Sequence, residues 1–339
     1  MHRTMSVTKP GTLTSVQDAG RPGHLGKGIP PAGAQDNASF RAANLLVGNE
    51  VGGSVLSADP RGAAAIECTL MGPTVNFSAD VHVAVTGGAC KPKVDGTPIP
   101  TWEPVEVQAG RSLAIGPIQR GLRVYLAIGG GIAVPEYLGS RSTMLAAGLG
   151  GFEGRALRAG DVLPLDDPTS EPPLGRRFEP LDLPGSDVPS VLRAVRGPQA
   201  DLFDEESIKA FFTSQWTLST LTDRMGSRFT GSPLRFRPRP GYLARSAGAN
   251  ASNIVDDIIP LGGVQCPDGA AAIVMGVEHP TAGGYAKIAT VISEDIRIVG
   301  QMRPGSKATF AEVSHEKAAS IGRRHDDLFT FDRLLEVAR

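Results

Sequence analysis

Glycine and proline interrupt this chain so often that long helices have little room to form. The 339 residues include 42 glycines and 27 prolines, dispersed along the chain rather than gathered in one tract. Together they make up about a fifth of the chain, above the average usage of roughly 12%. Because glycine reaches positive φ angles and proline fixes φ in turns, breakers between short apolar runs are typical of turn-rich β proteins. We therefore predict a mainly β fold with few short helices.

The composition excludes several classes of protein. Lys and Arg number 34 against 35 Asp and Glu, so the chain lacks the basic field that nonspecific binding to nucleic acid or an anionic membrane requires. The 41% of hydrophobic residues is enough for a packed core. No apolar run approaches the ~20 residues that span a bilayer, and residues 1–10 lack the apolar stretch of a signal peptide. We expect a soluble, cytoplasmic protein with no nucleic-acid or membrane partner.

The length of the chain suggests two domains of about 100–200 residues each. The best boundary is residues 166–190, which hold six prolines and little apolar periodicity, as a linker or an exposed crossover does. Short extended segments recur on both sides: Val81–Thr86, Val105–Val107, Ser112–Ile115 and Arg123–Ile128 before it, and Val191–Val195, Trp216–Leu218, Ala271–Val277, Ile288–Ile292 and Lys307–Phe310 after it. The predicted division is a first β-rich domain at 1–165, the linker at 166–190, a second β-rich domain at 191–313 and a polar tail at 314–339.

Three helices are predicted among these strands. Asp36 can cap a helix over Asn37–Val47, with Gly48 as its stop signal. Asp204 can cap a second helix over Glu205–Phe212. The polar residues 316–339 can form a terminal helix, although they offer poor caps.

The sequence carries no recognisable metal or nucleotide motif. The three cysteines, Cys68, Cys90 and Cys266, are far apart, and the six histidines show no metal-ligand spacing, so we predict buried core cysteines and no metal site. The glycine clusters at 129–131 and 148–154 do not clearly open a helix, which favours tight turns over a phosphate-binding loop. We predict that this chain alone binds no cofactor.

A first candidate site lies in the segment Pro10–Arg21, which is rich in turn residues. Glycines on both sides of Asp18 and Arg21 let the backbone approach a ligand closely. The carboxylate and the guanidinium can then fix a planar polar ligand. In the alternative interpretation, Asp18 and Arg21 form an internal ion pair that closes a loop.

A second candidate site follows the apolar segment Ala271–Val277. An acid–histidine pair, a glycine pair, a tyrosine and a lysine come in close succession: Glu278, His279, Gly283, Gly284, Tyr285 and Lys287. Glu278 or His279 can move protons, Lys287 can hold an anion, and the glycine amides can bind an oxyanion. The alternative is a hairpin with a solvated polar tip.

These segments belong to an ordered series of motifs. The series runs Pro10–Arg21, Gly33–Asp36, Ser39–Asn49, Leu70–Pro73, Leu126–Ile132, Leu138–Thr143, Gly150–Leu157, Arg196–Gln199, Thr222–Gly226 and Gly283–Val291. It resembles the biotin-dependent carboxyltransferase A/B subdomain family, also called allophanate hydrolase subunit 2. That family includes the C subunit of 5-oxoprolinase and the kinase-inhibitor-antagonist proteins. The resemblance covers roughly residues 5–313.

The resemblance implies both a fold and a role. The fold is two linked cyclophilin-like β-barrel subdomains. In its stand-alone bacterial form, the family supplies one subunit of an ATP-dependent 5-oxoprolinase, which opens 5-oxo-L-proline to L-glutamate. The implied partners are a smaller subunit similar to allophanate hydrolase subunit 1 and a lactam-utilisation-type subunit, with ATP consumed by the complex. In its fused form, the family is the carboxyltransferase part of a urea carboxylase, which uses biotin.

This chain departs from the family pattern at two places. The common Asp-Arg-Gln-Thr-Thr before the Gly-Gly-Tyr motif is here Glu278–Ala282, so that His279 replaces an arginine. Asn253–Asp256 stands where family members more often carry a turn rich in Ser and Glu or Asn. No biotin-attachment lysine in a Met-Lys-Met context is present, so a complete carboxylase would need other chains.

The main hypothesis is a subunit of a 5-oxoprolinase-type hydrolase that acts on a lactam or amide within a complex. The predicted catalytic residues are Glu278, His279, Asp18 and Lys287, and the predicted substrate-binding residues are Arg21, Arg141, Arg224, Gly283, Gly284 and Tyr285. Guanidinium groups suit a carboxylate or a phosphorylated intermediate because they bind both bidentately. Two alternatives stay open: a biotin-dependent carboxyltransferase acting on urea or a related amide, and a non-enzymatic regulator of a sensor-kinase inhibitor.

Overall fold

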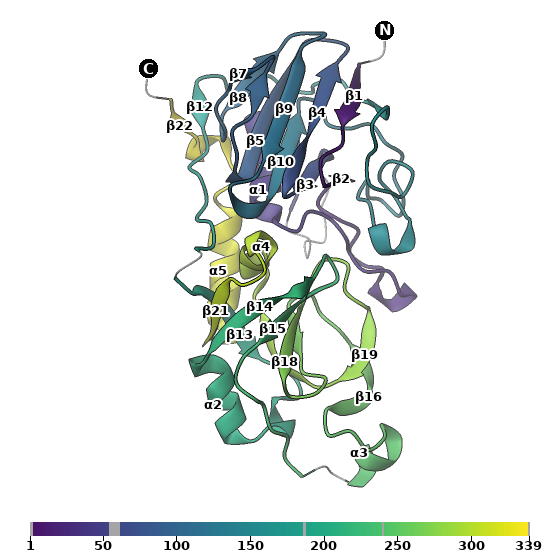
Figure 1. Ribbon diagram of the computed structural model, residues 1–339, viewed down its shortest axis with the longest axis vertical. Helices are drawn as coiled ribbons and strands as arrows, with labels where there is room; N and C mark the ends of the chain where they lie inside the picture. Colours follow the sequence, from purple (N-terminus) through teal and green to yellow (C-terminus); the bar gives the residue numbers. More distant parts are fainter. Residues whose placement is uncertain (1–2, 54–61, 186–187, 239–240, 338–339) are drawn as a thin grey trace. The chain divides into compact units, whose positions relative to one another are not determined.

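The computed structural model of the chain consists of two compact units (Figure 1). The structure describes residues 3–53, 62–185, 188–238 and 241–337. The first unit comprises Met1–Gly23, Pro31–Leu183 and His325–Arg339, and the second comprises His24–Pro30 and Pro184–Arg324. The main passage from the first unit to the second therefore falls at residues 183–184, inside the stretch predicted as a linker.

The first unit contains two antiparallel sheets. Their strand orders are β11–β1–β4–β9–β6–β7 and β2–β3–β10–β5–β8. The first sheet has β1 (Thr4–Lys9), β4 (Met71–Phe77), β6 (Lys93–Val94), β7 (Thr97–Pro98), β9 (Ser112–Pro117) and β11 (Val162–Pro164), and the second has β2 (Leu13–Gln17), β3 (Ala65–Thr69), β5 (Val81–Ala89), β8 (Pro104–Val107) and β10 (Arg120–Ile128). One apolar core takes side chains from both sheets, among them Val75, Leu113, Ile66 and Leu126. These strands thus form two sheets around a shared core rather than one closed barrel.

Helix α1 (Asn37–Leu46) covers the other face of the five-stranded sheet. Phe40 and Leu46 of the helix belong to the same buried cluster as Ala84 and Ala127 of the sheet. Small side chains on these strands let the helix approach the sheet closely. The N-cap predicted at Asp36 is present, because its carboxylate accepts hydrogen bonds from the Ser39 backbone N–H at 3.0 Å and from the Ser39 hydroxyl at 2.7 Å.

Removal of this cap gives a first test of the fold. We expect Asp36→Ala to lower the free energy of unfolding of the first unit by about 1–2 kcal/mol, because the capping contact is buried. The matched variant Asp204→Ala removes the less buried N-cap of α2 (Glu205–Thr213) and is expected to lower the free energy of unfolding by a smaller amount. Urea denaturation of both variants measures the two losses. A smaller loss for Asp36→Ala than for Asp204→Ala would contradict the importance of burial at this cap.

The last residues of the chain pack within the first unit. Phe329 stacks on Phe178 with ring centroids 5.6 Å apart, and Phe178 stacks on Trp102 at 6.0 Å. The Arg41 guanidinium lies 4.1 Å from the centre of the Phe329 ring and donates a hydrogen bond to Asp326 at 2.6 Å. This aromatic stack links the helix α1 region to two segments that are remote in sequence.

A short strand pair accompanies the stack. β12 (Arg176–Arg177) pairs with β22 (Leu335–Glu336). Residues 166–183 of the predicted linker are thus built into the first unit, because Phe178 and β12 anchor them. The predicted tail is divided: α5 (His315–Asp326) begins in the second unit, and residues 325–339 belong to the first.

The second unit contains a closed barrel with the strand order β13–β20–β17–β18–β15–β14–β21. Its strands are β13 (Ser190–Arg196), β14 (Gln215–Thr222), β15 (Gly226–Thr230), β17 (Gly263–Gln265), β18 (Ala271–Met275), β20 (Lys287–Val291) and β21 (Lys307–Glu312). β13 and β21 are parallel and close the barrel, and the other pairs are antiparallel. Phe310 packs in the core against Phe211, Trp216 and Phe229. A mainly β fold with few short helices is confirmed.

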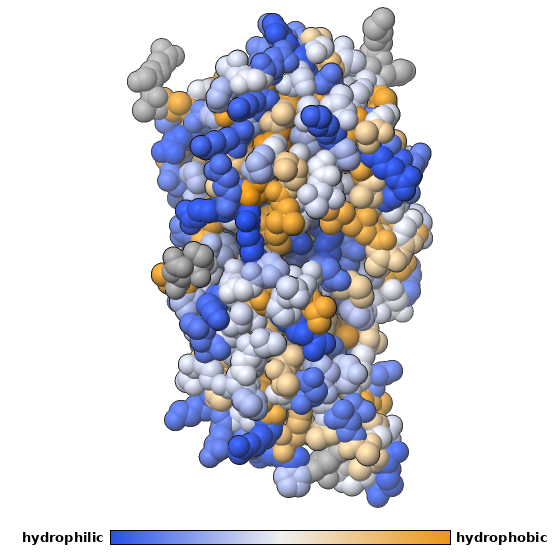
Figure 2. Space-filling view, viewed as in Figure 1, coloured by the Kyte–Doolittle hydropathy of each residue, from blue (hydrophilic) through white to orange (hydrophobic). Residues whose placement is uncertain are grey.

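The second unit also contains α3 (Gly241–Ser246), α4 (Ser293–Gln301), the two-stranded ribbon of β16 (Asn253–Ile258) and β19 (Ala282–Tyr285), and 3-10 turns at Leu25–Lys27 and Ala200–Leu202. Two further 3-10 turns, Leu145–Ala147 and Phe331–Arg333, belong to the first unit. Helix α4 was not predicted, because its N-cap position is Ile292, which offers no side-chain cap. Among the described residues, no helix has both the length and the apolar character needed to cross a bilayer. Figure 2 shows hydrophilic side chains interspersed with smaller hydrophobic groups on the visible face.

Candidate functional site

Asp18 holds together two loops of the first unit. The residue is 7% exposed, and its carboxylate accepts hydrogen bonds from the Gly20 backbone N–H at 2.8 Å and the Ser140 hydroxyl at 2.7 Å. The backbone N–H of Arg141 and the hydroxyl of Ser142 also donate to it. Four donors therefore surround this carboxylate, and they tie the loop of Asp18 to residues 140–142.

Arg21 supports the same loops from the interior. Its side chain is buried, and Nε donates to the Tyr137 carbonyl at 3.2 Å while a terminal nitrogen donates to the Ser142 carbonyl. Asp18 and Arg21 thus both bind the segment 137–142. This arrangement is similar to the alternative interpretation, in which Asp18 and Arg21 close a loop. Here the two residues hold the loop by binding residues 137–142.

A pocket of about 310 Å³ brings Asp18 and Arg141 together. It is lined by Asp18, Gly20, Asn49, Glu50, Gly62, Ala63, Gly130, Glu136, Gly139, Arg141, Asp166, Asp167 and Thr169. The Arg141 guanidinium donates to Asp166 at 2.7 Å and to the Ile132 carbonyl at 3.2 Å, and 27% of its side chain is exposed. The pocket therefore presents one partly exposed guanidinium among carboxylates.

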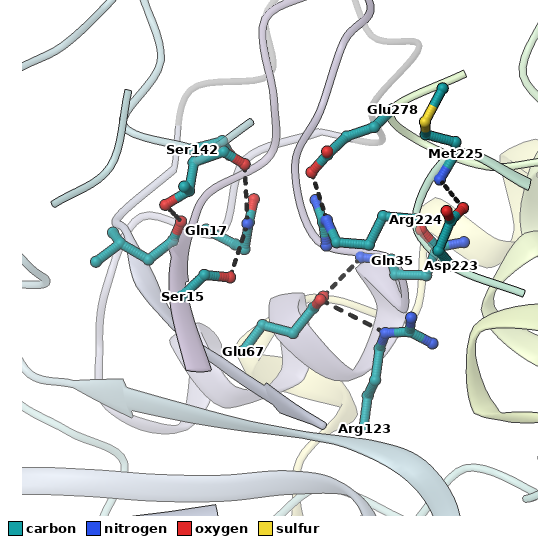
Figure 3. A network of polar contacts seen from close by, with 12 residues as sticks. Ser15, Gln17, Gln35, Glu67, Arg123, Ser142, Asp223, Arg224, Met225 and Glu278 are labelled. Carbon is teal, nitrogen blue, oxygen red and sulfur yellow. Dashed lines mark hydrogen bonds and ion pairs between the residues drawn. The ribbon is translucent and has the colours of Figure 1, made fainter. Parts of the chain in front are cut away.

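In the second unit, Arg224 and Glu278 form a buried ion pair. Nε of Arg224 lies 2.5 Å from Oε1 of Glu278, and the side chains are 6% and 2% exposed (Figure 3). Arg224 follows β14 and Glu278 follows β18, and the Glu278 backbone N–H also donates to the Arg224 carbonyl at 3.0 Å. The pair therefore ties together two loops at the ends of barrel strands.

The contacts of His279 determine which of its ring nitrogens carries the proton. It is 1% exposed, and its Nδ1 lies 2.8 Å from the Pro280 carbonyl. Because a carbonyl only accepts, Nδ1 carries the proton and Nε2 carries a lone pair. Nε2 is buried and has no hydrogen-bond partner within the described part of the chain. Burial also lowers the pKa of His279, which keeps the ring neutral at pH 7.

The lowered pKa of His279 predicts a dependence of stability on pH. In the unfolded chain the imidazole titrates near 6.5, and in the folded chain it titrates at a lower pH. Between these values the unfolded chain binds more protons, so the folded state loses stability as the pH falls below about 6.5. We expect His279→Gln to lose less stability than the wild type between pH 7 and pH 5 in urea denaturation. Parallel pH profiles for the two proteins would contradict the assignment.

Lys287 lies in β20 with its side chain 1% exposed. Nζ lies 3.0 Å from Oδ2 of Asp257 on β16, and the Gln199 side chain donates to the same oxygen at 3.1 Å. The hydrogen bond from Lys287 lowers the pKa of the Asp257 carboxyl. The ammonium group of Lys287 is thus held by a carboxylate that is itself 45% exposed.

The glycine pair and Tyr285 lie on β19. Gly284 and Tyr285 line a pocket of about 550 Å³ together with Ser246, Ala247, Asn253, Ile254, Val255 and Asp256. A Cβ at position 284 would lie 2.9 Å from a carboxylate oxygen of Asp256, so glycine leaves room for that carboxylate. Gly283 faces the opposite way, where a Cβ would meet Ile259 at 2.9 Å. The structure therefore places Gly284 and Tyr285 in one pocket and Gly283 outside its lining.

The glycine clusters at 129–131 and 148–154 pack against the chain itself. A Cβ at Gly130 would lie 2.1 Å from the Asp166 carbonyl oxygen, and one at Gly154 would lie 2.0 Å from the Gly148 carbonyl oxygen. These glycines serve close backbone packing, in agreement with the tight-turn interpretation. Among the described residues, no group of three His, Cys, Asp or Glu side chains is arranged to hold a metal ion.

A buried polar cluster in the first unit was not predicted from the sequence. Glu67 accepts a hydrogen bond from the Tyr125 hydroxyl at 2.7 Å. It also accepts one from the Gln35 backbone N–H at 2.9 Å and lies 3.5 Å from Nε of Arg123 (Figure 3). These residues are at most 6% exposed. One signal could have revealed the cluster: Glu67 is a lone carboxylate in the otherwise apolar run of residues 63–68.

Comparison with known proteins identifies the family. The chain is 36% identical over 336 residues to the urea amidolyase of Saccharomyces cerevisiae, covering 95% of this chain and 17% of that protein. It is 34% identical over 330 residues to the C subunit of the 5-oxoprolinase of Escherichia coli, covering 97% of each. The chain therefore spans about a sixth of the length of the urea amidolyases that it matches.

The structural and family comparisons agree. The crystal structure of the K. lactis urea amidolyase matches 99% of this chain and 20% of that chain, with a TM-score of 0.82 at 35% identity. Residues 27–312 match the family described as "Carboxyltransferase domain, subdomain A and B". The chain belongs to this carboxyltransferase-domain family.

Proposed function

We propose that this chain is the counterpart of the C subunit in an ATP-dependent 5-oxoprolinase, a hydrolase that opens 5-oxo-L-proline to L-glutamate. The reciprocal coverage with the C subunit of the E. coli 5-oxoprolinase carries the proposal, because the alignment spans 97% of each chain. Nearly every part of that E. coli protein therefore has an equivalent here. By contrast, 17% of the yeast urea amidolyase is matched.

The proposed complex contains further subunits. We place a smaller subunit similar to allophanate hydrolase subunit 1 and a lactam-utilisation-type subunit beside this chain, in the cytoplasm. The glycine clusters pack on their own backbone and form no phosphate cradle, so we assign ATP to the other subunits.

Within this chain we assign His279 to proton transfer. Nε2 can accept a proton from the water that attacks the amide carbon after ATP has phosphorylated the amide oxygen, and the resulting imidazolium can return a proton to the ring nitrogen as the C–N bond breaks. A second water then releases phosphate from the acyl phosphate that this cleavage leaves, which gives the carboxylate. Glu278 fixes Arg224 and the turn that carries His279. Arg141 is the partly exposed cation of its own pocket in the first unit, and we assign it to an anionic group of a ligand bound in that pocket.

The test is reconstitution of the complex. Co-expression of the chain with its partner subunits is expected to give glutamate release from 5-oxo-L-proline that depends on ATP. Samples without ATP, and samples without this chain, serve as controls. The absence of glutamate release from a complete, folded complex would exclude the proposal.

Carboxyl transfer to urea is the second candidate. The TM-score of 0.82 with the K. lactis urea amidolyase over 99% of this chain favours it. Under this candidate, a carboxylated biotin should lose its carboxyl group faster when urea and this chain are both present. Isothermal titration that detects no affinity for biotin would count against it.

A further inference from the structure

A charged contact joins the barrel of the second unit to the ribbon of β16 and β19, which is a separate two-stranded sheet (Figure 1). Lys287 of the barrel is fully buried, and its Nζ donates to Oδ2 of Asp257 on the ribbon at 3.0 Å. The Asp257 side chain is 45% exposed. Within the described chain, this carboxylate is the one acceptor for the three N–H groups of the ammonium. A buried cation is therefore held by a single, solvent-accessible carboxylate.

Gln199 donates to the same carboxylate oxygen. Its Oε1 accepts a hydrogen bond from the Lys287 backbone N–H at 3.2 Å, and its Nε2 donates to Oδ2 of Asp257 at 3.1 Å. Because a backbone N–H only donates, the Lys287 contact fixes Nε2 as the end of the amide that faces Asp257. An ammonium and an amide thus define the position of one carboxylate oxygen.

Gln265 supplies a further donor at this place. The strand register puts Gln265 of β17 opposite Lys287 of β20, and opposite residues of antiparallel strands point to the same face. Gln265 is 5% exposed, and its Nε2 is buried without a hydrogen-bond partner among the residues described. On the ribbon, Gly283 lies opposite Asp257, and a Cβ at Gly283 would lie 3.4 Å from Nε2 of Gln265. The unpartnered amide therefore lies against the part of the ribbon that carries Asp257.

These contacts leave more donors than acceptors around Asp257. A buried donor without an acceptor destabilises the protein, and a ligand that brings oxygen atoms recovers that loss. The Asp257 carboxylate shows which chemistry fits, because it is planar and carries one negative charge for the one ammonium of Lys287. A phosphate group would bring about −1.5 to −2 charges to a site with a single cation. The donors therefore favour a carboxylate.

We propose that Lys287, Gln199 and Gln265 form a binding site for the carboxylate group of a small molecule, and that Asp257 occupies this site until the ligand displaces it. Asp257 can leave by rotation of its own side chain, because that side chain already reaches solvent. Asp257 is then an autoinhibitory occupant, and the ribbon sets the access to Lys287. The function proposed above uses none of these residues, and the inference does not depend on it.

Removal of the occupant tests the site. Thermal unfolding of the full chain is followed by circular dichroism at pH 7, in acetate and in chloride of equal ionic strength. The compared quantity is the rise in the midpoint of Asp257→Ala on changing chloride for acetate, minus the same rise in the wild type. We expect this acetate-specific rise to be at least about 2 °C, because acetate replaces the missing carboxylate beside Lys287. Acetamide, which is neutral, and inorganic phosphate are expected to give smaller rises.

Asp256→Ala is the matched control. Asp256 is the neighbouring exposed carboxylate on β16, and its removal is expected to give no acetate-specific rise. The proposal is overturned if Asp257→Ala shows no such rise, if acetamide acts equally well, or if phosphate acts more strongly than acetate. If Asp257→Ala does not fold, Asp257→Asn gives the same comparison, because its amide keeps the shape and lacks the charge.

Gln265→Met separates a role in binding from a role in the fold. Because it removes a buried donor that has no acceptor, it is expected to leave the midpoint in chloride unchanged or higher. In the Asp257→Ala background it is expected to weaken acetate binding about tenfold, measured from the dependence of the midpoint on acetate concentration. A lower midpoint with unchanged acetate affinity would show a structural role and overturn the proposal. Glutamate release enters none of these measurements, so their outcome is distinct from that of the proposed function.

Discussion

Glu278→Ala is expected to lower the free energy of unfolding of the second unit by about 3–5 kcal/mol, because it leaves the buried guanidinium of Arg224 without its carboxylate. Removing one member of a buried ion pair costs this much since the remaining charge stays desolvated. Trp216 lies in the barrel core, so its fluorescence reports unfolding of this unit. A Trp102→Phe background removes the second tryptophan, which lies in the first unit.

The control is an ion pair of similar length at the surface of the same barrel. Arg196 and Glu312 lie 2.6 Å apart, but their side chains are 52% and 43% exposed. Glu312→Ala is therefore expected to cost less than about 1 kcal/mol. If Glu278→Ala costs no more than Glu312→Ala, the Arg224–Glu278 pair has no structural role and both residues are free for chemistry.

His279→Gln is expected to lower kcat of the reconstituted complex by roughly 10²–10⁴-fold, the usual contribution of a general base. Glutamine keeps a polar side chain but cannot take up a proton. The wild type should lose activity as the pH falls through the lowered pKa of His279, below about 6.5, because the protonated ring cannot accept a proton. The variant should lack this acid limb.

Glutamate release measured from pH 5 to pH 8 checks both expectations. His315→Gln changes a histidine that is exposed at the start of α5, and it should leave kcat and the pH profile unchanged. An unchanged kcat in His279→Gln, or an acid limb that persists in that variant, would remove His279 from the proton transfer. A fall in kcat with an unaltered KM would support a role in the chemical step.

Local signals in the sequence were sufficient to predict many individual elements. Asp36 and Asp204 cap helices at the predicted residues, because an N-cap depends on contacts only three residues away. Helix α4 escaped prediction because Ile292 gives no cap signal. The packing of Phe178 against Phe329 also escaped, since it joins a proline-rich stretch to the chain's last residues, and no local pattern records such a contact.

The candidate sites were predictable in part for a similar reason. Asp18 and Arg141 lie in glycine-rich loops that the sequence singles out, and the structure brings them into one pocket. The partners of Lys287 and the position of Gln265 depend instead on strand register, which pairs Lys287 with Gln265. A register forms only when distant strands meet, so side-chain type alone could not place these groups.

The return of residues 325–339 to the first unit has a consequence for biosynthesis. Strand β21 closes the barrel against β13, and Phe329 and β22 complete the first unit only after the ribosome has translated the whole of the second. An N-terminal domain usually folds while later domains are still being synthesised. In this chain the first unit cannot finish folding until residues 325–339 have been synthesised. A premature stop codon shortly before Phe329 would leave the barrel strands intact and damage the unit whose synthesis began first.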